Sequence, residues 1–160
     1  MALNHEHYMD ICLELALKAG AEGNRPLGSL IVDDAGTILS QGTNRVYTDS
    51  DPTAHGEMVV IRELSAKRRT QDLSGLTLYT SMEPCPMCCW AILETKFDRL
   101  VLGARHADLG RKDIGRYSVE TMLELTGRSI ELVTGVRAKE CLDIRLAWIA
   151  ERAKQGLGPR

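Results

Sequence analysis

The sequence predicts one α/β domain in three layers, with helices covering both faces of a sheet. Segments with strand-like patterns alternate with segments of helical periodicity along most of the chain. A length of 160 residues suits one domain with a sizeable core and is short for two. We therefore expect a single domain over residues 1–160, with residues 156–160 frayed at its end.

The first helix and the hairpin after it have clear sequence patterns. Apolar residues recur at helical spacing from His5 to Gly20, where glycine ends the helix. Leu27–Val32 is an apolar strand that leads into the turn-forming residues 33–36. A second strand is expected over Thr37–Gln41 or slightly beyond, so the two strands form a hairpin.

The middle of the chain predicts helix, strand and helix. Thr53 can cap a helix over Ala54–Arg68, which has a broad apolar face. Leu76–Thr80 is a short apolar strand. It runs directly into residues 83–85, where a helix opens and continues to about Thr95.

The last third of the chain predicts two further strands and two further helices. Arg99–Gly103 and Ser129–Thr134 have strand patterns, Tyr117–Leu125 is a short amphipathic helix, and Ala138–Lys154 is a closing helix. We see no repeat, low-complexity run or linker between these elements.

Bulk charge and cysteine content limit the partners and the compartment. The net charge of −2 gives no general attraction to phosphate backbones, so a nucleic-acid partner is not expected unless a local basic patch meets it. The N-terminus lacks the pattern of a secretion signal, and no apolar run approaches a membrane span. Five cysteines, three of them in one segment, indicate metal or redox chemistry in a reducing compartment. We expect a cytoplasmic location.

Two short motifs carry the donors of a metal site. His55-Gly56-Glu57 offers an imidazole and a carboxylate, and Cys85 and Cys88 offer two thiolates. A tetrahedral zinc site that does chemistry needs three protein ligands and one open position for water. His55, Cys85 and Cys88 supply nitrogen and sulfur donors suited to Zn²⁺. Glu57 is left over, beside the metal, as a proton carrier.

The spacing and charge of these residues predict a geometry and a reaction. Cys85 and Cys88 share a face of a helix and lie in its first turn, whereas His55 and Glu57 fit together only at a helix opening. Two helix N-termini should therefore meet at the zinc. Because two thiolates offset its charge, a carboxylate is needed to move the proton. This suits zinc-hydroxide attack on an amidine-type carbon with loss of ammonia, Glu57 being the proton shuttle.

Other interpretations of the cysteines are possible from the residues alone. The C-x-x-C pair could be a thioredoxin-like redox pair, although His55-x-Glu57 argues against it. A structural zinc site would need a fourth ligand, which Cys89, His106 or Cys141 could provide. Cys89 should instead point away from Cys88 as a small buried hydrophobe. His5 and His7 are expected at the surface.

Several motifs together resemble the cytidine and deoxycytidylate deaminase superfamily, over nearly the whole chain. The similarity is strongest to the branch of tRNA adenosine deaminases, guanine deaminases and fungal-type cytosine deaminases. It is carried by Asp51-Pro52-Thr53-Ala54-His55-Gly56-Glu57, Thr77-Leu78-Tyr79-Thr80, Glu83-Pro84-Cys85-Pro86-Met87-Cys88 and Leu102-Gly103-Ala104-Arg105.

The resemblance implies a fold, a cofactor and site residues. The fold is the three-layer α/β/α cytidine deaminase-like fold with a central five-stranded mixed sheet. One zinc per subunit is held by His55, Cys85 and Cys88, Glu57 is the proton shuttle, and the usual assembly is a homodimer. Asn44 matches an asparagine that hydrogen-bonds the base; from the residues alone it could be a simple turn residue.

The motifs differ in which branch they favour. Gly56 matches cytosine deaminases, whereas residues 83–88 and His106-Ala107-Asp108 are more similar to guanine deaminases, and Asp113 could contact a purine amidine edge or be a solvated loop residue. By this resemblance we expect the substrate to be contacted by Asn44, Gly56, His106, Asp108 and Asp113. The expected substrate is therefore a free nucleobase or small nucleoside, guanine- or cytosine-like. The alternative is a tRNA-specific adenosine deaminase, favoured by basic clusters at residues 67–69 and 111–116. A second alternative is a non-catalytic zinc-stabilised binding module.

Overall fold

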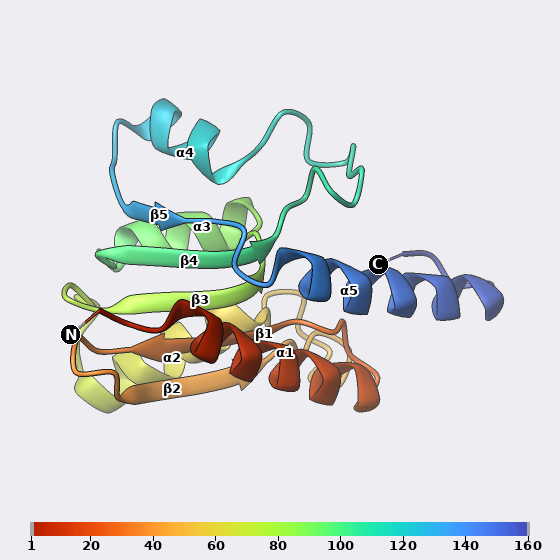
Figure 1. Cartoon of the computed structure of the whole chain (residues 1–160), viewed down its shortest axis with the longest axis horizontal. Coiled ribbons are helices and arrows are strands. Elements are labelled where there is room, and N and C mark those ends of the chain that lie inside the picture. The colour runs from red at the N-terminus through yellow and green to blue at the C-terminus, as the bar shows by residue number, and fades with distance from the viewer. Residues whose placement is uncertain (1, 160) are drawn as a thin grey trace.

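The computed structural model describes residues 2–159, which form five helices and five strands (Figure 1). This confirms the predicted α/β class. In chain order the elements are α1 (His5–Ala21), β1 (Gly28–Val32), β2 (Ile38–Thr43), α2 (Gly56–Arg68), β3 (Thr77–Met82), α3 (Pro86–Glu94), β4 (Arg99–Ala104), α4 (Val119–Thr126), β5 (Glu131–Val133) and α5 (Ala138–Lys154).

The five strands form one mixed sheet in the order β2-β1-β3-β4-β5. The hairpin partners β1 and β2 are antiparallel, and β1 is also antiparallel to β3. The pairs β3–β4 and β4–β5 are parallel. The carboxyl ends of β3 and β4 therefore meet at one edge, which is where ligands bind in open α/β sheets.

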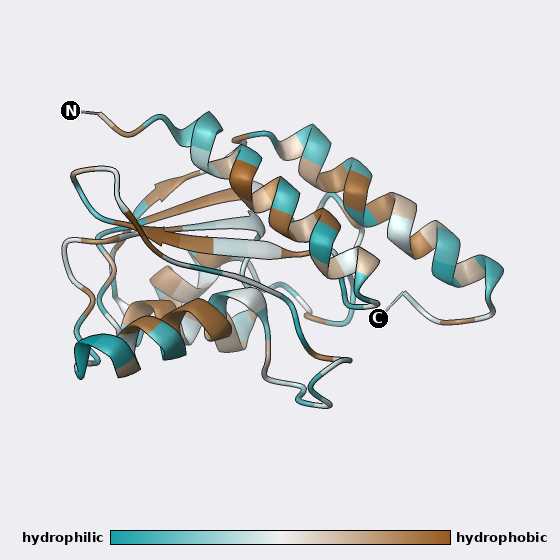
Figure 2. Cartoon of the chain, turned by 90° about the horizontal axis from the view of Figure 1, so that it is seen from below, coloured by the Kyte–Doolittle hydropathy of each residue, from teal (hydrophilic) through white to brown (hydrophobic). Residues whose placement is uncertain are grey.

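Helices cover both faces of the sheet, as the alternating pattern predicts. Figure 2 shows the two long helices, α1 and α5, side by side on one face, with the shorter helices on the other. On that second face α2 contacts α3, and α3 contacts α4. No helix within residues 2–159 is both long enough and apolar enough to cross a membrane.

Strand alternation divides the core into two clusters, one on each face. Along β4, Leu100 and Leu102 face the α2 side, and Val101 faces the α1 side. Along β3, Leu78 and Tyr79 divide in the same way. All five side chains are at most 1% exposed, so β3 and β4 are a rigid base for the loops at their carboxyl ends.

The start of α2 corrects one expected boundary. The helix begins at Gly56 with His55 as its N-cap, and Thr53 is not the cap. The backbone N–H and hydroxyl of Thr53 both donate to Asp51 Oδ1, at 2.8 and 2.7 Å. This local turn competes with the helix and delays its start by two residues.

His5 also differs from expectation, and the C-terminal tail contacts α5. His7 is exposed, but His5 is only partly exposed, and its Nδ1 lies 2.8 Å from the hydroxyl of Tyr79. Residues 156–159 fold back along α5, where Arg152 Nε donates to the Gly158 carbonyl at 2.8 Å (Figure 1). This contact joins the described part of the tail to α5, and fraying of residues 156–160 stays a prediction; Arg160 lies outside the described residues.

Candidate active site and metal centre

Three predicted donor atoms converge at the edge of the sheet. The sulfur atoms of Cys85 and Cys88 are 3.6 Å apart, and His55 Nδ1 lies 3.5 and 3.4 Å from them. Tetrahedral zinc with ordinary bond lengths would separate two sulfurs by about 3.8 Å and sulfur from nitrogen by about 3.5 Å. The donor set therefore fits a zinc ion without rearrangement.

Two helix N-termini bring these donors together, as their spacing predicts. Cys85 is the N-cap of α3, with Pro86 in its first turn, and His55 is the N-cap of α2. Both side chains contact the Cys88 sulfur in the first turn of α3, so both point toward the site. The pKa of Cys85 is lowered to about 4, first because the Cys88 thiol donates to its sulfur and also because His55 is adjacent. A thiolate is thus ready for a cation at this position.

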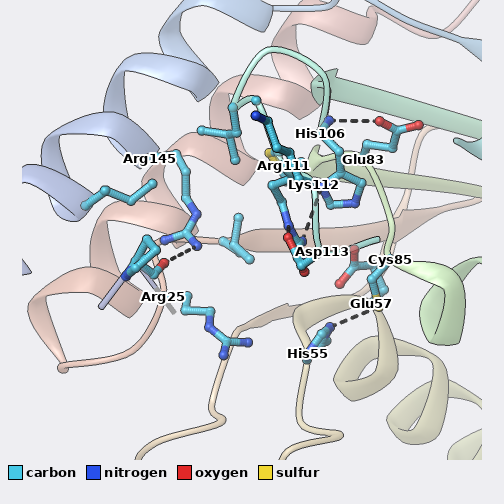
Figure 3. Close-up of a pocket in the computed structure, with 16 residues that line it drawn as sticks. Arg25, His55, Glu57, Glu83, Cys85, His106, Arg111, Lys112, Asp113 and Arg145 are labelled. Carbon is cyan, nitrogen blue, oxygen red and sulfur yellow. Dashed lines mark hydrogen bonds and ion pairs between the residues drawn. The ribbon is translucent and has the colours of Figure 1, made fainter. Parts of the chain in front are cut away.

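Glu57 lies beside the donor atoms as a buried carboxylate. Glu57 is 5% exposed, and Figure 3 shows its side chain next to Cys85 and His55. Burial raises the pKa of Glu57, which favours a carboxyl group that can both accept and release a proton.

Two residues that sequence reasoning missed hold Glu57 in place. Thr80 Oγ1 donates to Glu57 Oε1 at 3.3 Å, and Ser29 Oγ donates to Thr80 Oγ1 at 3.0 Å. Both hydroxyls lie on buried central strands. β3 also carries Thr77 and Ser81, so no local pattern in the sequence distinguishes Thr80.

A pocket of about 530 Å³ opens in front of His55, Glu57 and Cys85. This volume lies within the usual range for small-molecule sites. Its far wall comes from residues before β1, from the loop after β4 and from α5 and the tail (Figure 3). The lining residues are Arg25, Leu27, His55, Glu57, Met82, Glu83, Cys85, His106, Leu109, Gly110, Arg111, Lys112, Asp113, Arg145, Ile149 and Pro159.

Two of the predicted substrate-contact residues line this pocket. His106 is 4% exposed, and burial, followed by the charge of Arg111, lowers the pKa of its imidazole. Asp113 forms an ion pair with Arg111 at 2.6 Å. The loop after β4 therefore presents a neutral imidazole and a carboxylate to the pocket.

The other predicted contacts lie behind or outside the lining. Asn44 is fully buried; its Oδ1 accepts from the Val46 N–H at 3.2 Å, and its Nδ2 has no partner within residues 2–159. A Cβ on Gly56 would lie 3.6 Å from the backbone nitrogen of Asn44, so these two residues adjoin. Asp108 lies outside the pocket lining, where its exposed carboxylate accepts from the Arg105 N–H and closes a turn.

Glu83 is a second positioning residue for the pocket wall. Its carboxylate accepts from the N–H groups of His106 and Val119, at 2.9 and 3.0 Å, and pairs with Arg105 at 3.2 Å. The sequence placed Glu83 in a motif but gave it no role. It connects the start of α3 to both ends of the 105–119 loop, and so fixes the wall that carries His106.

The pocket has a basic rim, formed by Arg25, Arg111, Lys112 and Arg145. Arg111 and Lys112 belong to a cluster seen in the sequence, whereas Arg25 and Arg145 are isolated there. Because those two arginines are far apart along the chain, only the fold brings them to one site. The net charge of −2 therefore hides a local concentration of positive charge.

The cysteines outside the motif do not complete a four-ligand site. Cys89 packs in the apolar cluster beneath α2 and α3, as expected, and Cys141 packs against β4 on the opposite face of the sheet. Within the part of the chain that the structure describes, the only group of three or more potential metal donors is His55, Cys85 and Cys88. A three-donor site with an open position and a buried carboxylate is the arrangement of a catalytic zinc centre.

Comparison with known proteins agrees with this chemistry. The family model for the cytidine and deoxycytidylate deaminase zinc-binding region matches residues 3–104, and the chain belongs to this family. It is a zinc-dependent hydrolase that acts on the C–N bonds of cyclic amidines. The predicted cofactor, Zn²⁺, and the five-stranded deaminase fold are thereby confirmed.

Relatives and solved structures point to one branch of the family. The chain is 39% identical to the tRNA-specific adenosine deaminase of Haemophilus influenzae, covering 85% of this chain and 78% of that protein. A structure from a study of A-to-I editing by tRNA:A34 deaminases superimposes with a TM-score of 0.74 at 28% identity, covering 86% and 98% of the two chains. The guanine deaminase of Nitrosomonas europaea superimposes with a TM-score of 0.80 at 29% identity, covering 92% and 86%.

These relatives correct two expectations. The first was a free nucleobase or small nucleoside as substrate, and the second was that a nucleic-acid partner is unlikely; both are wrong, because the sequence relatives named tRNA-specific adenosine deaminase match over most of the chain. The physical error was to argue from net charge. The whole-chain value averages over the surface and does not describe the basic rim of the pocket.

Proposed function

We propose that this protein is a tRNA-specific adenosine deaminase, which converts adenosine to inosine and releases ammonia. The observation that carries the proposal is a zinc-type donor set and a buried carboxylate at the base of a pocket with four basic residues at its rim. A polyanionic substrate would be attracted to this rim. The identity of the sequence relatives supports the same substrate.

In this proposal His55, Cys85 and Cys88 hold the zinc ion. When bound, zinc acts as a Lewis acid and lowers the pKa of water. Glu57 takes a proton from the attacking water and later delivers it to the departing amine. Thr80 and Ser29 keep the Glu57 carboxylate aimed at that position.

The remaining residues would receive a base that has been turned out of its stack. Asn44 Nδ2, a buried donor with no partner within residues 2–159, would hydrogen-bond the base. His106 and Asp113 would contact it from the opposite wall. A single-stranded loop suits this mode of binding, because unpaired bases can be splayed out into a pocket.

The test is inosine formation by protein that contains one zinc per chain. Purified tRNA is incubated with the protein, digested to nucleosides and analysed by mass spectrometry, with free adenosine as a parallel substrate. We expect inosine from tRNA and little from adenosine. Zinc-loaded protein that forms no inosine in any tRNA would end the proposal.

Three further expectations belong to this proposal. One domain over residues 1–160 is supported by the single sheet that both core clusters share, and one cooperative unfolding transition tests it. A homodimer is supported by exposed apolar side chains on α3 and α4, Trp90 and Leu125, and light scattering tests it. A cytoplasmic location is supported by five free cysteines and is tested by fractionation.

A further inference from the structure

Arg145 is a buried cation at the pocket, and no charged partner pairs with it among residues 2–159. It is 8% exposed, lies on α5 and lines the pocket (Figure 3). Its guanidinium lies over the Trp148 ring, 4.7 Å from the centroid, and Nη2 donates to the Pro159 carbonyl at 3.2 Å. Its Nη1 is buried and has no hydrogen-bond partner within residues 2–159.

The buried charge of Arg145 contributes an unfavourable free energy that a bound anion would offset. Burying a charged group is costly unless it is paired and hydrogen-bonded, and a neutral carbonyl satisfies only part of a guanidinium. Burial, followed by the charges of Arg25 and Arg111, lowers the pKa of Arg145 to about 10, so it is still cationic at neutral pH. Stacking on Trp148 fixes the plane of the guanidinium, which then presents Nη1 in one direction.

Arg25, in the segment between α1 and β1, supplies a second guanidinium to the pocket. It lines the same pocket, its Nε is buried without a partner within residues 2–159, and its guanidinium lies 5.5 Å from the centroid of the Tyr47 ring. Figure 3 shows Arg25 and Arg145 on the side of the pocket away from Glu57. Arg111 differs from both, because Asp113 already pairs with it.

We propose that Arg145 and Arg25 form a subsite for a phosphate group of the substrate, at the wall opposite the zinc donors. The planar fork of arginine matches phosphate oxygens, and two such groups with no carboxylate partner in the described part of the chain suit a dianion or a phosphodiester. The source assigned to this phosphate is a backbone phosphodiester next to the nucleotide that is deaminated; this assignment of the source rests on the proposed function. A phosphate there would anchor the strand while the base occupies the zinc side.

The test measures binding to zinc-loaded protein carrying Glu57→Gln, so that no probe is consumed. The probes are an anticodon stem-loop RNA, the same RNA with a neutral methylphosphonate beside the target adenosine, adenosine 5′-monophosphate, and adenosine. We expect Arg145→Gln to weaken binding of the ordinary RNA roughly 10- to 100-fold and to reduce its salt dependence by about one contact. Compared with the ordinary RNA, the methylphosphonate RNA should bind more weakly to the protein that retains Arg145, and equally tightly to Arg145→Gln.

Controls separate loss of the subsite from loss of the fold. Lys96→Gln removes an exposed charge just after α3, outside the pocket lining, and should leave RNA binding within about twofold. If Arg145→Gln unfolds, Arg25→Gln, which is only partly buried, carries the same test. Zinc content and the unfolding midpoint are measured for every variant.

The outcomes distinguish this subsite from the proposed function. If Arg145→Gln and Arg25→Gln keep their zinc, and bind RNA and the monophosphate as tightly as the parent, the subsite does not exist and Arg145 only packs on Trp148. If both variants weaken binding of the monophosphate only, the subsite stands but its assignment to a backbone phosphodiester falls, whereas the tRNA substrate is decided separately by inosine formation. Weakened RNA binding with an absent methylphosphonate effect would overturn the phosphate contact.

Discussion

Glu57 is the residue on which the proposed chemistry depends most directly. Glu57→Gln keeps the size of the side chain and removes its ability to carry a proton, so we expect turnover of tRNA to fall roughly 100- to 10,000-fold while zinc stays bound. Inosine formation and metal content are measured on the same samples. Glu63→Gln, on the same helix but hydrogen-bonded to Ser40 on the far side, should retain full activity. Retained turnover in Glu57→Gln would remove the proton-shuttle role.

Thr80 acts on the reaction only through Glu57. Thr80→Val keeps the shape of the side chain and removes the hydroxyl that donates to the carboxylate at 3.3 Å. We expect kcat to fall about tenfold with KM nearly unchanged, because a hydrogen bond to a charged group is lost and the carboxylate is no longer held. Thr77→Val is the matched control: Thr77 is equally buried on β3, but its hydroxyl contacts Arg99 instead. Equal kcat values in the two variants would contradict a positioning role for Thr80.

His106 should make the stability of the protein depend on pH. Burial and the nearby Arg111 lower the pKa of His106 below its ordinary value of 6.5, so the unfolded chain binds this proton more tightly. The free energy of unfolding therefore rises with pH between the two pKa values and falls as pH drops below about 6.5. Urea unfolding at pH 7 and pH 5 should show a smaller loss for His106→Gln than for the wild type. The exposed His7→Gln should behave as the wild type does; a loss that is the same in all three proteins would exclude this contribution.

At the residue scale, the sequence predicted the metal donors and the buried carboxylate better than it predicted which residues line the pocket. His55, Glu57, Cys85 and Cys88 were predicted because donor type and spacing limit what can share one ion. Asp108 was expected at the substrate but closes a turn with the Arg105 N–H instead. Ser29, Thr80 and Arg145 had no local pattern to mark them, because their importance arises from neighbours brought close only by the fold.

The helices and strands were predictable because their patterns are local. The closing helix α5 has the predicted bounds, and both metal-bearing helices start where their motifs lie. The start of α2 was missed by two residues because Asp51 and Thr53 form a side-chain turn that a propensity argument does not see. The first residue of such a helix depends on whether a local side-chain hydrogen bond or the helical conformation is lower in free energy.

Gly28 tests how closely α1 packs on the sheet. A Cβ at Gly28 would lie 2.4 Å from the Cys12 carbonyl oxygen, which is helix backbone and cannot rotate aside. We expect Gly28→Ala to lower the free energy of unfolding by about 1–3 kcal/mol or more, because α1 must shift away from β1. Gly158→Ala, where a Cβ meets open space, should change it by less than about 0.5 kcal/mol. Chemical denaturation measures both, and a neutral Gly28→Ala would show that α1 moves freely on the sheet.

At the scale of the whole molecule, charge was the least informative property of the sequence. A net charge of −2 describes neither the basic rim of the pocket nor the ion pairs elsewhere on the surface. The three-layer architecture was predictable because alternation of strands and helices leaves few ways to bury the apolar faces. The substrate was not, because relatives of similar identity to this chain have names that specify different substrates, guanine deaminase and tRNA-specific adenosine deaminase.

Zinc should stabilise the whole fold, since its proposed ligands join the N-termini of α2 and α3 across the end of β3. When the free metal concentration is 100 times the Kd, metal binding adds about 2.7 kcal/mol to the free energy of unfolding. For a chain of this size, that corresponds to roughly 5–10 °C in Tm. We therefore expect a chelator to lower Tm by that amount, and added zinc to restore it. Cys85→Ala should contain little zinc, melt near the chelated wild type and respond to neither reagent, because metal binding and folding are coupled. Full zinc occupancy in Cys85→Ala would show that the ion is held by other residues, and the proposed ligand set would then be wrong.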